Sequence, residues 1–377
     1  MPELVALDLP QGPALVVALA GIWSQGDAAC VLDPRLSPAA RQRSLEVLRP
    51  TSILTSEGRL QNPGGQETEP GDALVVLTSG STADPKAAVL THDAVAASAR
   101  ASSAALGIDP RAHRWVACLP CAHIGGLSVV TRALLTDTPL VVLDRPDPHA
   151  LEVMAAEGAT HVSLVSTALA RIEASWFERI LLGGAAPPEG LPSNVVTTYG
   201  MTETGSGIVY DGRALKGVEL AISNTSEDFG EILVRAPQLA RSYRDRPLPS
   251  ITGPDGTDGW FPTGDLGHLD LNGILNVKGR AADVIVTGAE KVFPADVEMI
   301  LMGLPGIAEV AVWKRPDPEW GERVVAFVVP EGEPPSLETL RSVVTEHLAP
   351  WAAPRELVLL ERLPRTESGK IKRAALG

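Results

Sequence analysis

Residues 73–86 read ALVVLTSGSTADPK, and this stretch decides the fold. Its first part, Ala73 to Leu77, is a short and wholly apolar run of the kind that is buried within a sheet. Four hydroxyl residues and a glycine follow, and Lys86 ends the stretch. We therefore expect a buried strand whose carboxyl end opens into a loop of N–H and O–H donors. The alternative is an ordinary polar turn between a strand and a helix.

Apolar runs of the same kind alternate with helix-like segments on both sides of this stretch. Helical periodicity is present at 15–23 and 38–48, whereas 61–72 is polar and rich in turn residues, which predicts a surface loop. Further strands are expected at 28–32, 53–54, 115–119, 140–143, 161–165, 179–182 and 195–198. Such alternation is typical of an α/β fold in which helices are layered against a largely parallel sheet.

The sequence pattern changes near residue 231 from alternating helices and strands to a segment rich in expected β-strands. We expect a large N-terminal domain at 1–279 and a small α+β domain at 280–377. One helix of the small domain is predicted to open at Pro294, a favourable first helical residue, and another after Ser336, a favourable N-cap. Their apolar faces are formed by Val297, Ile300, Leu301 and Leu304 and by Leu337, Leu340, Val344 and Leu348.

The composition is that of an ordinary globular protein, with 45% hydrophobic and 21% charged residues. The formal net charge of −14 disfavours nucleic acid and anionic membranes as partners, because both require basic patches. No apolar run approaches the roughly 20 residues of a membrane span, and no basic segment of a signal peptide precedes the first apolar residues. The expected location is the cytoplasm, and the oligomeric state is left open.

Cys118 and Cys121 have CxxC spacing, which is found in redox and zinc sites. A zinc site would need a second pair of ligands, and no such pair is present. We expect both cysteines to be small core residues.

The loop after the buried strand has the chemistry of a phosphate site. Backbone N–H groups, hydroxyls and an ammonium group are what a triphosphate needs from a protein of negative net charge. The order of residues differs from the GxxxxGK[ST] loop of ATPases. The candidate phosphate-binding residues are Thr78, Ser79, Gly80, Ser81, Thr82 and Lys86.

Further motifs follow this loop: GGAAPP at 183–188, YGMTETG at 199–205, WFPTGDLG at 260–267, Gly279–Arg280, and PRTESGK at 364–370. Together with the loop, they resemble the adenylate-forming superfamily of acyl-CoA synthetases, adenylation domains and luciferases. The resemblance covers nearly the whole chain from Ala73 onward. It implies the adenylate-forming fold with a mobile C-terminal domain. It also implies an ATP-dependent acid–thiol ligase that forms an acyl-AMP before the thioester.

The resemblance assigns a role to the residues of each motif. Thr202 and Glu203 match positions that hold the phosphates and Mg²⁺, a cation that prefers carboxylate oxygens. Asp265 matches the acceptor of both ribose hydroxyls, and Arg280 would assist the ribose or phosphate. The residues expected near the adenine ring of ATP or AMP are Gly184, Ala185, Tyr199, Gly200 and Met201.

Lys370 matches the mobile catalytic lysine of the family. A positioned ammonium group stabilises the charge that gathers at the α-phosphorus when a carboxylate attacks it. By resemblance, the small domain delivers this lysine for adenylation and then rotates about Ala282 to admit the thiol. Ala83 in the phosphate loop and Ala289 stand where the family usually has glycine, so each adds a methyl group.

The acid is suggested by residues 119–128, LPCAHIGGLS, and 160–167, THVSLVST. They resemble the compact o-succinylbenzoate–CoA ligases of menaquinone synthesis, in which a basic residue lies nine positions after a histidine. Here these acid-binding candidates are His123 and Arg132, and a second cation is reasonable for a dicarboxylate. The resemblance implies ATP, Mg²⁺ and coenzyme A, together with a small-molecule carboxylic acid.

Two other classes of function remain open. One is an adenylating enzyme for another aryl or fatty acid, or one that hands its acid to a carrier-protein thiol. The other is a catalytically impaired, nucleotide-binding paralogue, against which the intact Lys370, Glu203 and Asp265 argue. For Arg132 the competing interpretation is an arginine on a helix surface.

Overall fold

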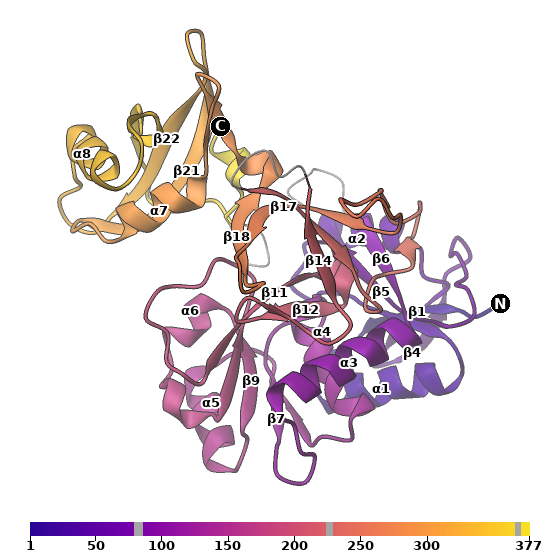
Figure 1. Ribbon diagram of the computed structural model, residues 1–377. Coiled ribbons are helices and arrows are strands. Elements are labelled where there is room, and N and C mark those ends of the chain that lie inside the picture. Colours follow the sequence, from indigo (N-terminus) through magenta and orange to yellow (C-terminus); the bar gives the residue numbers. More distant parts are fainter. Residues whose placement is uncertain (79–85, 224–228, 366–370) are drawn as a thin grey trace. The chain divides into compact units, whose positions relative to one another are not determined.

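The computed structural model describes residues 1–78, 86–223, 229–365 and 371–377 (Figure 1). The chain forms two compact units. The first contains Met1–Leu220, Val234–Phe261 and Asp270–Leu275, and the second contains Ala221–Leu233, Pro262–Leu269 and Asn276–Gly377. Each unit has an apolar core of its own.

The first sheet of the larger unit has the strand order β16-β6-β5-β2-β1-β3-β4. Strands β5, β2, β1 and β3 are parallel, while β6, β16 and β4 are antiparallel to their neighbours. Helix α2 begins where the sequence predicts, because the Ser37 hydroxyl accepts a hydrogen bond from Ala40 N (3.3 Å) and Pro38 follows it. The bounds are β1 Leu4–Asp8, α1 Pro13–Ser24, β2 Ala28–Val31, α2 Pro38–Leu48, β3 Ser52–Thr55, β4 Gly58–Gln61, β5 Asp72–Thr78, β6 Lys86–Thr91 and β16 Ser242–Tyr243.

The second sheet has the order β13-β12-β11-β10-β9-β7-β8. From β8 to β11 its strands are parallel, whereas β12 and β13 continue the sheet as antiparallel hairpins. The predicted parallel sheet is therefore correct for the strands that alternate with helices. The bounds are β7 Trp115–Ala117, β8 Leu140–Val142, α5 Pro148–Ala156, β9 His161–Leu164, α6 Ser166–Leu169, η1 Ala174–Trp176, β10 Arg179–Leu182, β11 Val195–Met201, η2 Thr202–Thr204, β12 Ser206–Tyr210 and β13 Arg213–Ala214.

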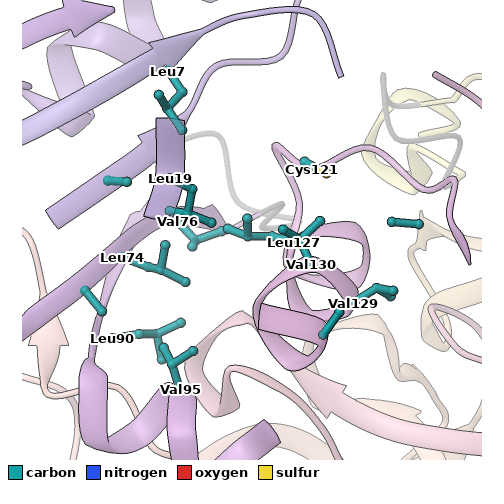
Figure 2. Close-up of a cluster of buried hydrophobic side chains, with 14 of the residues drawn as sticks. Leu7, Leu19, Leu74, Val76, Leu90, Val95, Cys121, Leu127, Val129 and Val130 are labelled. Carbon is teal, nitrogen blue, oxygen red and sulfur yellow. The ribbon is translucent and has the colours of Figure 1, made fainter. Parts of the chain in front are cut away.

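Helices α3 (His92–Leu106) and α4 (Ile124–Leu135) pack against each other and share a core with both sheets. Figure 2 shows Val76 of β5 beside Leu127 of α4, within the same apolar cluster as Leu74 and Val130. Burying one such side chain contributes about 1.5–3 kcal/mol. This shared core therefore fixes the positions of the two sheets in the larger unit.

Two expectations about small or polar segments have different outcomes. Cys118 and Cys121 are free and buried, and burial raises the pKa of each thiol to about 12, so they are core residues as predicted. The predicted surface loop at 61–72 is partly wrong. Thr68 is buried, and Asp72 is buried as an ion pair with Arg241 (2.9 Å), a residue distant in sequence that local composition does not reveal.

In the second unit, helices α7 (Pro294–Met302) and α8 (Leu337–His347) cover a sheet of order β20-β19-β22-β21, with β23 paired to β22. Both helices begin where predicted, and the Ser336 hydroxyl caps α8 by accepting from Thr339 N (3.1 Å). A further sheet, β14-β15-β17-β18, has most of its residues in this unit. The bounds are β14 Glu219–Ile222, β15 Gly230–Arg235, β17 Phe261–Leu269, β18 Leu275–Arg280, η3 Ala281–Asp283, β19 Ile285–Thr287, β20 Glu290–Val292, β21 Ile307–Asp317, β22 Gly321–Pro330, η4 Pro350–Ala352, β23 Glu356–Leu359 and η5 Arg373–Ala375.

The hairpin between β19 and β20 contains one of the two departures from the family pattern. Its loop is Gly288–Ala289, and both residues have positive φ, 60° and 70°. Gly288 lies against the Trp320 ring, because a Cβ there would meet that ring at 2.6 Å. The left-handed backbone conformation of Ala289 is strained for a residue with a Cβ. Because Ala289 is exposed, its methyl group gains no packing contacts that would offset this strain.

We predict that Ala289→Gly stabilises the protein by about 0.5–1 kcal/mol. The left-handed conformation costs alanine about 1–2 kcal/mol, and the greater entropy of unfolded glycine cancels part of the gain. The free energy of unfolding in denaturant measures the change. Ala20→Gly, at an exposed position with ordinary helical φ in α1, is the control and should destabilise by about 1 kcal/mol. Destabilisation by both variants would contradict the assignment of strain to Ala289.

Candidate active site

Loops from several strands meet at one edge of the second sheet, where its parallel strands end. Thr198 on β11 donates its hydroxyl to Leu182 O (3.2 Å), and a Cβ on Gly183 would lie 2.6 Å from that hydroxyl. Gly184 has φ +92°, and a Cβ there would lie 3.6 Å from Val165, the residue after β9. The structure thus brings the turn containing Gly184 and Ala185 beside the segment that carries Tyr199.

The end of β11 approaches β12 so closely that only glycine fits. A Cβ on Gly200 would lie 2.2 Å from Ser206 O, and Gly200 is paired with Gly207 across the two strands. Met201 N then donates to the Thr204 hydroxyl (2.9 Å), which closes the single turn of η2. This turn carries Thr202 and Glu203, two of the predicted site residues.

Glu203 is a nearly buried carboxylate, with 9% of its surface exposed. Its carbonyl accepts from Ala240 N (2.7 Å), and its Oε1 accepts from the Tyr243 hydroxyl (2.8 Å). Within the described residues, no lysine, arginine or histidine forms an ion pair with it. A buried carboxylate without a cation is poorly compensated. It therefore fits a role as a ligand of a divalent cation.

The two ends of the predicted phosphate loop lie opposite each other. Thr78 ends β5, Lys86 begins β6, and the two residues are paired across these antiparallel strands. Turn η2 packs against both strands, so Glu203 belongs to the same region. The alternative of a strand-to-helix turn is wrong, since the chain continues as β6 before α3 begins. Ser79, Gly80, Ser81 and Thr82 lie outside the described residues, as do Ala83 and Lys370.

The second unit brings Asp265 and Arg280 together. Asp265 on β17 is 7% exposed and pairs with the Arg280 Nε at 2.9 Å. Arg280, the last residue of β18, also donates to Thr263 O (3.1 Å). Gly264, the residue before Asp265, has φ +73° and donates its N–H to the Glu231 carboxylate (2.8 Å). The arginine and this turn fix the orientation of the Asp265 carboxylate.

His123 lies just before α4, on the segment that follows β7. Its Nε2 is 3.6 Å from the carboxylate of Asp33, which is buried and receives hydrogen bonds from Arg35. Burial alone would raise the pKa of Asp33, but the bonds from Arg35 outweigh it and leave that pKa below its usual value. The Gln11 amide donates to Leu119 O (3.0 Å) and accepts from Cys121 N (2.8 Å). Gln11 thus holds the segment that presents His123, and Asp33 places a carboxylate beside the His123 ring.

Arg132 lies at the other end of α4, about 13.5 Å along the helix axis from His123. The structure therefore does not bring the two acid-binding candidates together. Arg132 is 2% exposed, so the interpretation as a helix-surface arginine is wrong. Its Nε donates to the Ser102 hydroxyl (2.7 Å), and its guanidinium lies 4.9 Å from the Trp115 ring centroid. Its Nη1 has no hydrogen-bond partner, and no carboxylate of the described residues pairs with it.

Three residues of this region were missed by sequence reasoning: Tyr243, Asp33 and Gln11. Tyr243 lies in the segment 240–246, which contains three arginines, and no local pattern shows that it contacts Glu203, 40 residues earlier. Asp33 precedes a proline and reads as an ordinary turn residue. Gln11 lies 110 residues from Cys121, its partner. Only the tertiary fold reveals these contacts.

Among the described residues, no group of three or more His, Cys, Asp or Glu side chains could hold a metal ion. Mg²⁺ is commonly bound by one or two carboxylates together with substrate phosphates, and Glu203 suits that mode. In the same part of the chain, no helix is long and apolar enough to cross a bilayer.

Comparison with known proteins gives consistent matches to one family. The profile of AMP-binding enzymes matches residues 58–244, and that of the AMP-binding enzyme C-terminal domain matches residues 296–370. The probable 2-succinylbenzoate–CoA ligase of Mycobacterium tuberculosis (strain H37Rv) is 37% identical over 338 residues, which are 83% of this chain and 85% of the relative. The 2-succinylbenzoate–CoA ligase of Listeria monocytogenes (strain F2365) is 33% identical over 331 residues, or 81% and 69% of the two chains.

Solved structures agree with this assignment. The o-succinylbenzoate CoA synthetase of Bacillus subtilis, in complex with the acyl-adenylate intermediate, superposes with a TM-score of 0.86 at 29% identity and covers 99% of this chain and 88% of its own. The same enzyme with ATP and magnesium ion gives a TM-score of 0.84 at 29% identity, with 99% and 89% coverage. The chain belongs to the family of AMP-binding, adenylate-forming enzymes.

Proposed function

We propose that this chain is an AMP-forming 2-succinylbenzoate–CoA ligase. In the first step, a carboxylate oxygen of the acid attacks the α-phosphorus of ATP and pyrophosphate leaves, which gives the acyl-AMP. In the second step, the CoA thiol attacks the acyl carbon, the thioester forms and AMP leaves. The observation that carries the proposal is the 37% sequence identity to a probable 2-succinylbenzoate–CoA ligase, in an alignment that covers 83% of the chain. We assign the reaction to the cytoplasm, which holds ATP and CoA, and to menaquinone synthesis.

In this proposal Glu203 and Thr202 face the phosphates, and Glu203 is the protein ligand of Mg²⁺. When bound, Mg²⁺ neutralises phosphate charge and so makes the α-phosphorus easier to attack. The buried carboxylate, its place beside the ends of the phosphate loop, and the absence of a paired cation among the described residues support this role. Thr78, Lys86 and the loop between them would hold the triphosphate through N–H, O–H and ammonium donors.

Adenine would lie between the Gly184–Ala185 turn and Tyr199. Gly200 and Met201, the next residues of β11, would line the same side of the adenine site as Tyr199. Gly184 and Ala185 are exposed, so this turn is open to a ligand, and Tyr199 is half-buried. Asp265 would accept both ribose hydroxyls, and Arg280, which already orients its carboxylate, would assist it. Support for these roles comes from the family motifs and from the local geometry of each unit.

The catalytic cation of the first step is Lys370 in this proposal. It would stabilise the charge that develops at the α-phosphorus. Residues 280–377 would move as a body relative to 1–279, about Ala282 in the exposed turn η3, and would withdraw Lys370 before the thiol enters.

We propose that Arg132 pairs with the second carboxylate of the acid. A buried guanidinium whose Nη1 lacks a partner, with no carboxylate nearby in the described residues, would gain from an anion. Burial, together with His113 and two arginines, lowers the pKa of the nearby His161 to about 4, so that ring is neutral at pH 7 and does not repel Arg132. Arg132 and His123 lie about 13.5 Å apart along the axis of α4, so in this proposal Arg132 alone contacts the second carboxylate.

We predict that Lys370→Ala lowers acyl-AMP formation by about 10²–10³-fold, the usual effect of removing one electrostatic stabiliser of a transition state. Thioester formation from pre-made acyl-AMP and CoA should keep its rate. Pyrophosphate release measures the first step, and single-turnover thioester formation measures the second. Lys372→Ala, at an exposed lysine two residues away, is the control and should change neither. Equal losses in both steps would contradict the division of labour.

We predict that 2-succinylbenzoate is preferred over benzoate and medium-chain fatty acids, and that Arg132→Ala reduces this preference. A hydrogen-bonded contact with a charged group contributes about 1.5–3 kcal/mol, or about 10–150-fold in kcat/KM. The variant should lose this factor on 2-succinylbenzoate and far less on a monocarboxylate, whereas Arg100→Ala, at an exposed arginine of α3, should leave the ratio unchanged. An equal loss of kcat/KM on both acids would contradict the proposed contact and would show that Arg132 has only a structural role in the core.

A further inference from the structure

Tyr243 connects the end of the phosphate loop to the candidate metal-binding carboxylate. It lies on β16, which pairs with β6 so that Tyr243 is opposite Ala88. Its side chain is 5% exposed, and its hydroxyl donates to the Glu203 Oε1 at 2.8 Å. Tyr243 and Glu203 are therefore largely shielded from water, and a hydrogen bond to a carboxylate is stronger in such surroundings than in water.

Two cations lie beside the Tyr243 ring. Lys86 Nζ is 5.4 Å from the ring centroid, and the Arg246 guanidinium carbon is 5.3 Å from it. Both distances are within the range of cation–π attraction. Positive charge near the ring also makes its hydroxyl a better donor, which strengthens the bond to Glu203. The Tyr243 side chain thus approaches Lys86, a phosphate-site candidate, through its ring and binds Glu203, the metal-site candidate, through its hydroxyl.

The segment 240–243 fixes Glu203 at two points. Ala240 N donates to the Glu203 carbonyl (2.7 Å), and Tyr243 donates to its carboxylate. The backbone and the tip of the side chain are therefore both held by one short piece of chain. Such fixation removes much of the rotamer freedom that a glutamate would otherwise lose when it binds a cation.

We propose that Tyr243 is a positioning residue for Mg·ATP. By holding Oε1, it fixes the orientation of the Glu203 carboxylate and leaves Oε2 for the cation that accompanies the triphosphate. This inference rests on the proposed role of Glu203. Partners that hold metal ligands in place typically change metal affinity by about 10–100-fold when they are removed.

The test is Tyr243→Phe, which keeps the buried ring and deletes only the hydroxyl. Its half-saturating Mg²⁺ concentration in acid-dependent ATP–pyrophosphate exchange should rise about 10–100-fold, and saturating Mg²⁺ should largely restore the rate. Mn²⁺ binding in the presence of a non-hydrolysable ATP analogue, followed by electron paramagnetic resonance, should weaken by the same factor without any turnover. The control is Thr138→Val, which deletes another buried hydroxyl of the same unit and should leave both values unchanged.

Glu203→Gln and the double variant separate the possible outcomes. Glu203→Gln should itself raise the Mg²⁺ requirement, and adding Tyr243→Phe should then have little further effect, because the two residues act through one contact. Additive effects, or a Tyr243→Phe variant whose only change is a lower melting temperature, would overturn the inference and leave the ligase proposal intact. An unchanged Mg²⁺ requirement in Glu203→Gln would overturn both this inference and the role proposed for Glu203.

Discussion

Parallel strand order is the constraint on which the candidate site depends. Since β7, β9, β10 and β11 run in the same direction, the segments that follow them must emerge at one edge of the sheet. Residues from distant motifs meet there as a consequence: His123 after β7, Val165 after β9, Gly184 after β10 and Tyr199 within β11. The antiparallel turn from β11 to β12 then directs Glu203 toward β5 and β6, the strands that bound the phosphate loop. The geometry of the candidate ATP site is thus largely a property of sheet topology.

Close packing and buried charge then determine how the individual residues of the site are placed on this sheet. Gly200 lies so near Ser206 O that any side chain would displace β12 and, with it, the turn that carries Glu203. Two charged groups of the larger unit, Glu203 and Arg132, are buried without an ion-pair partner among the described residues. Each is hydrogen-bonded by a neutral hydroxyl, from Tyr243 and Ser102 respectively. A folded protein tolerates such groups at a cost in stability, and a ligand of opposite charge offsets that cost when it binds.

The sequence predicted features that depend on neighbouring residues. The helix at 38–48, the helix after the N-cap Ser336 and the buried strand from Ala73 were predicted, since helical periodicity, caps and buried strands have local signals. Features set by distant partners were missed or incompletely predicted. Strand β11 extends to Met201 because it pairs with β12, Asp72 is buried because Arg241 pairs with it, and Arg132 is buried against Trp115 and Ser102. The site motifs were found through family resemblance, whereas their supporting residues, Tyr243, Asp33 and Gln11, required the structure.

The central claim is that the chain joins 2-succinylbenzoate to CoA through an acyl-AMP. The most direct measurement is mass spectrometry of the products that the purified chain forms from 2-succinylbenzoate and Mg·ATP, before and after CoA is added. We expect acyl-AMP and pyrophosphate without CoA, and conversion of the acyl-AMP to equal amounts of thioester and AMP once CoA is present. Formation of ADP and phosphate, or an acyl-AMP that CoA does not convert, would contradict it.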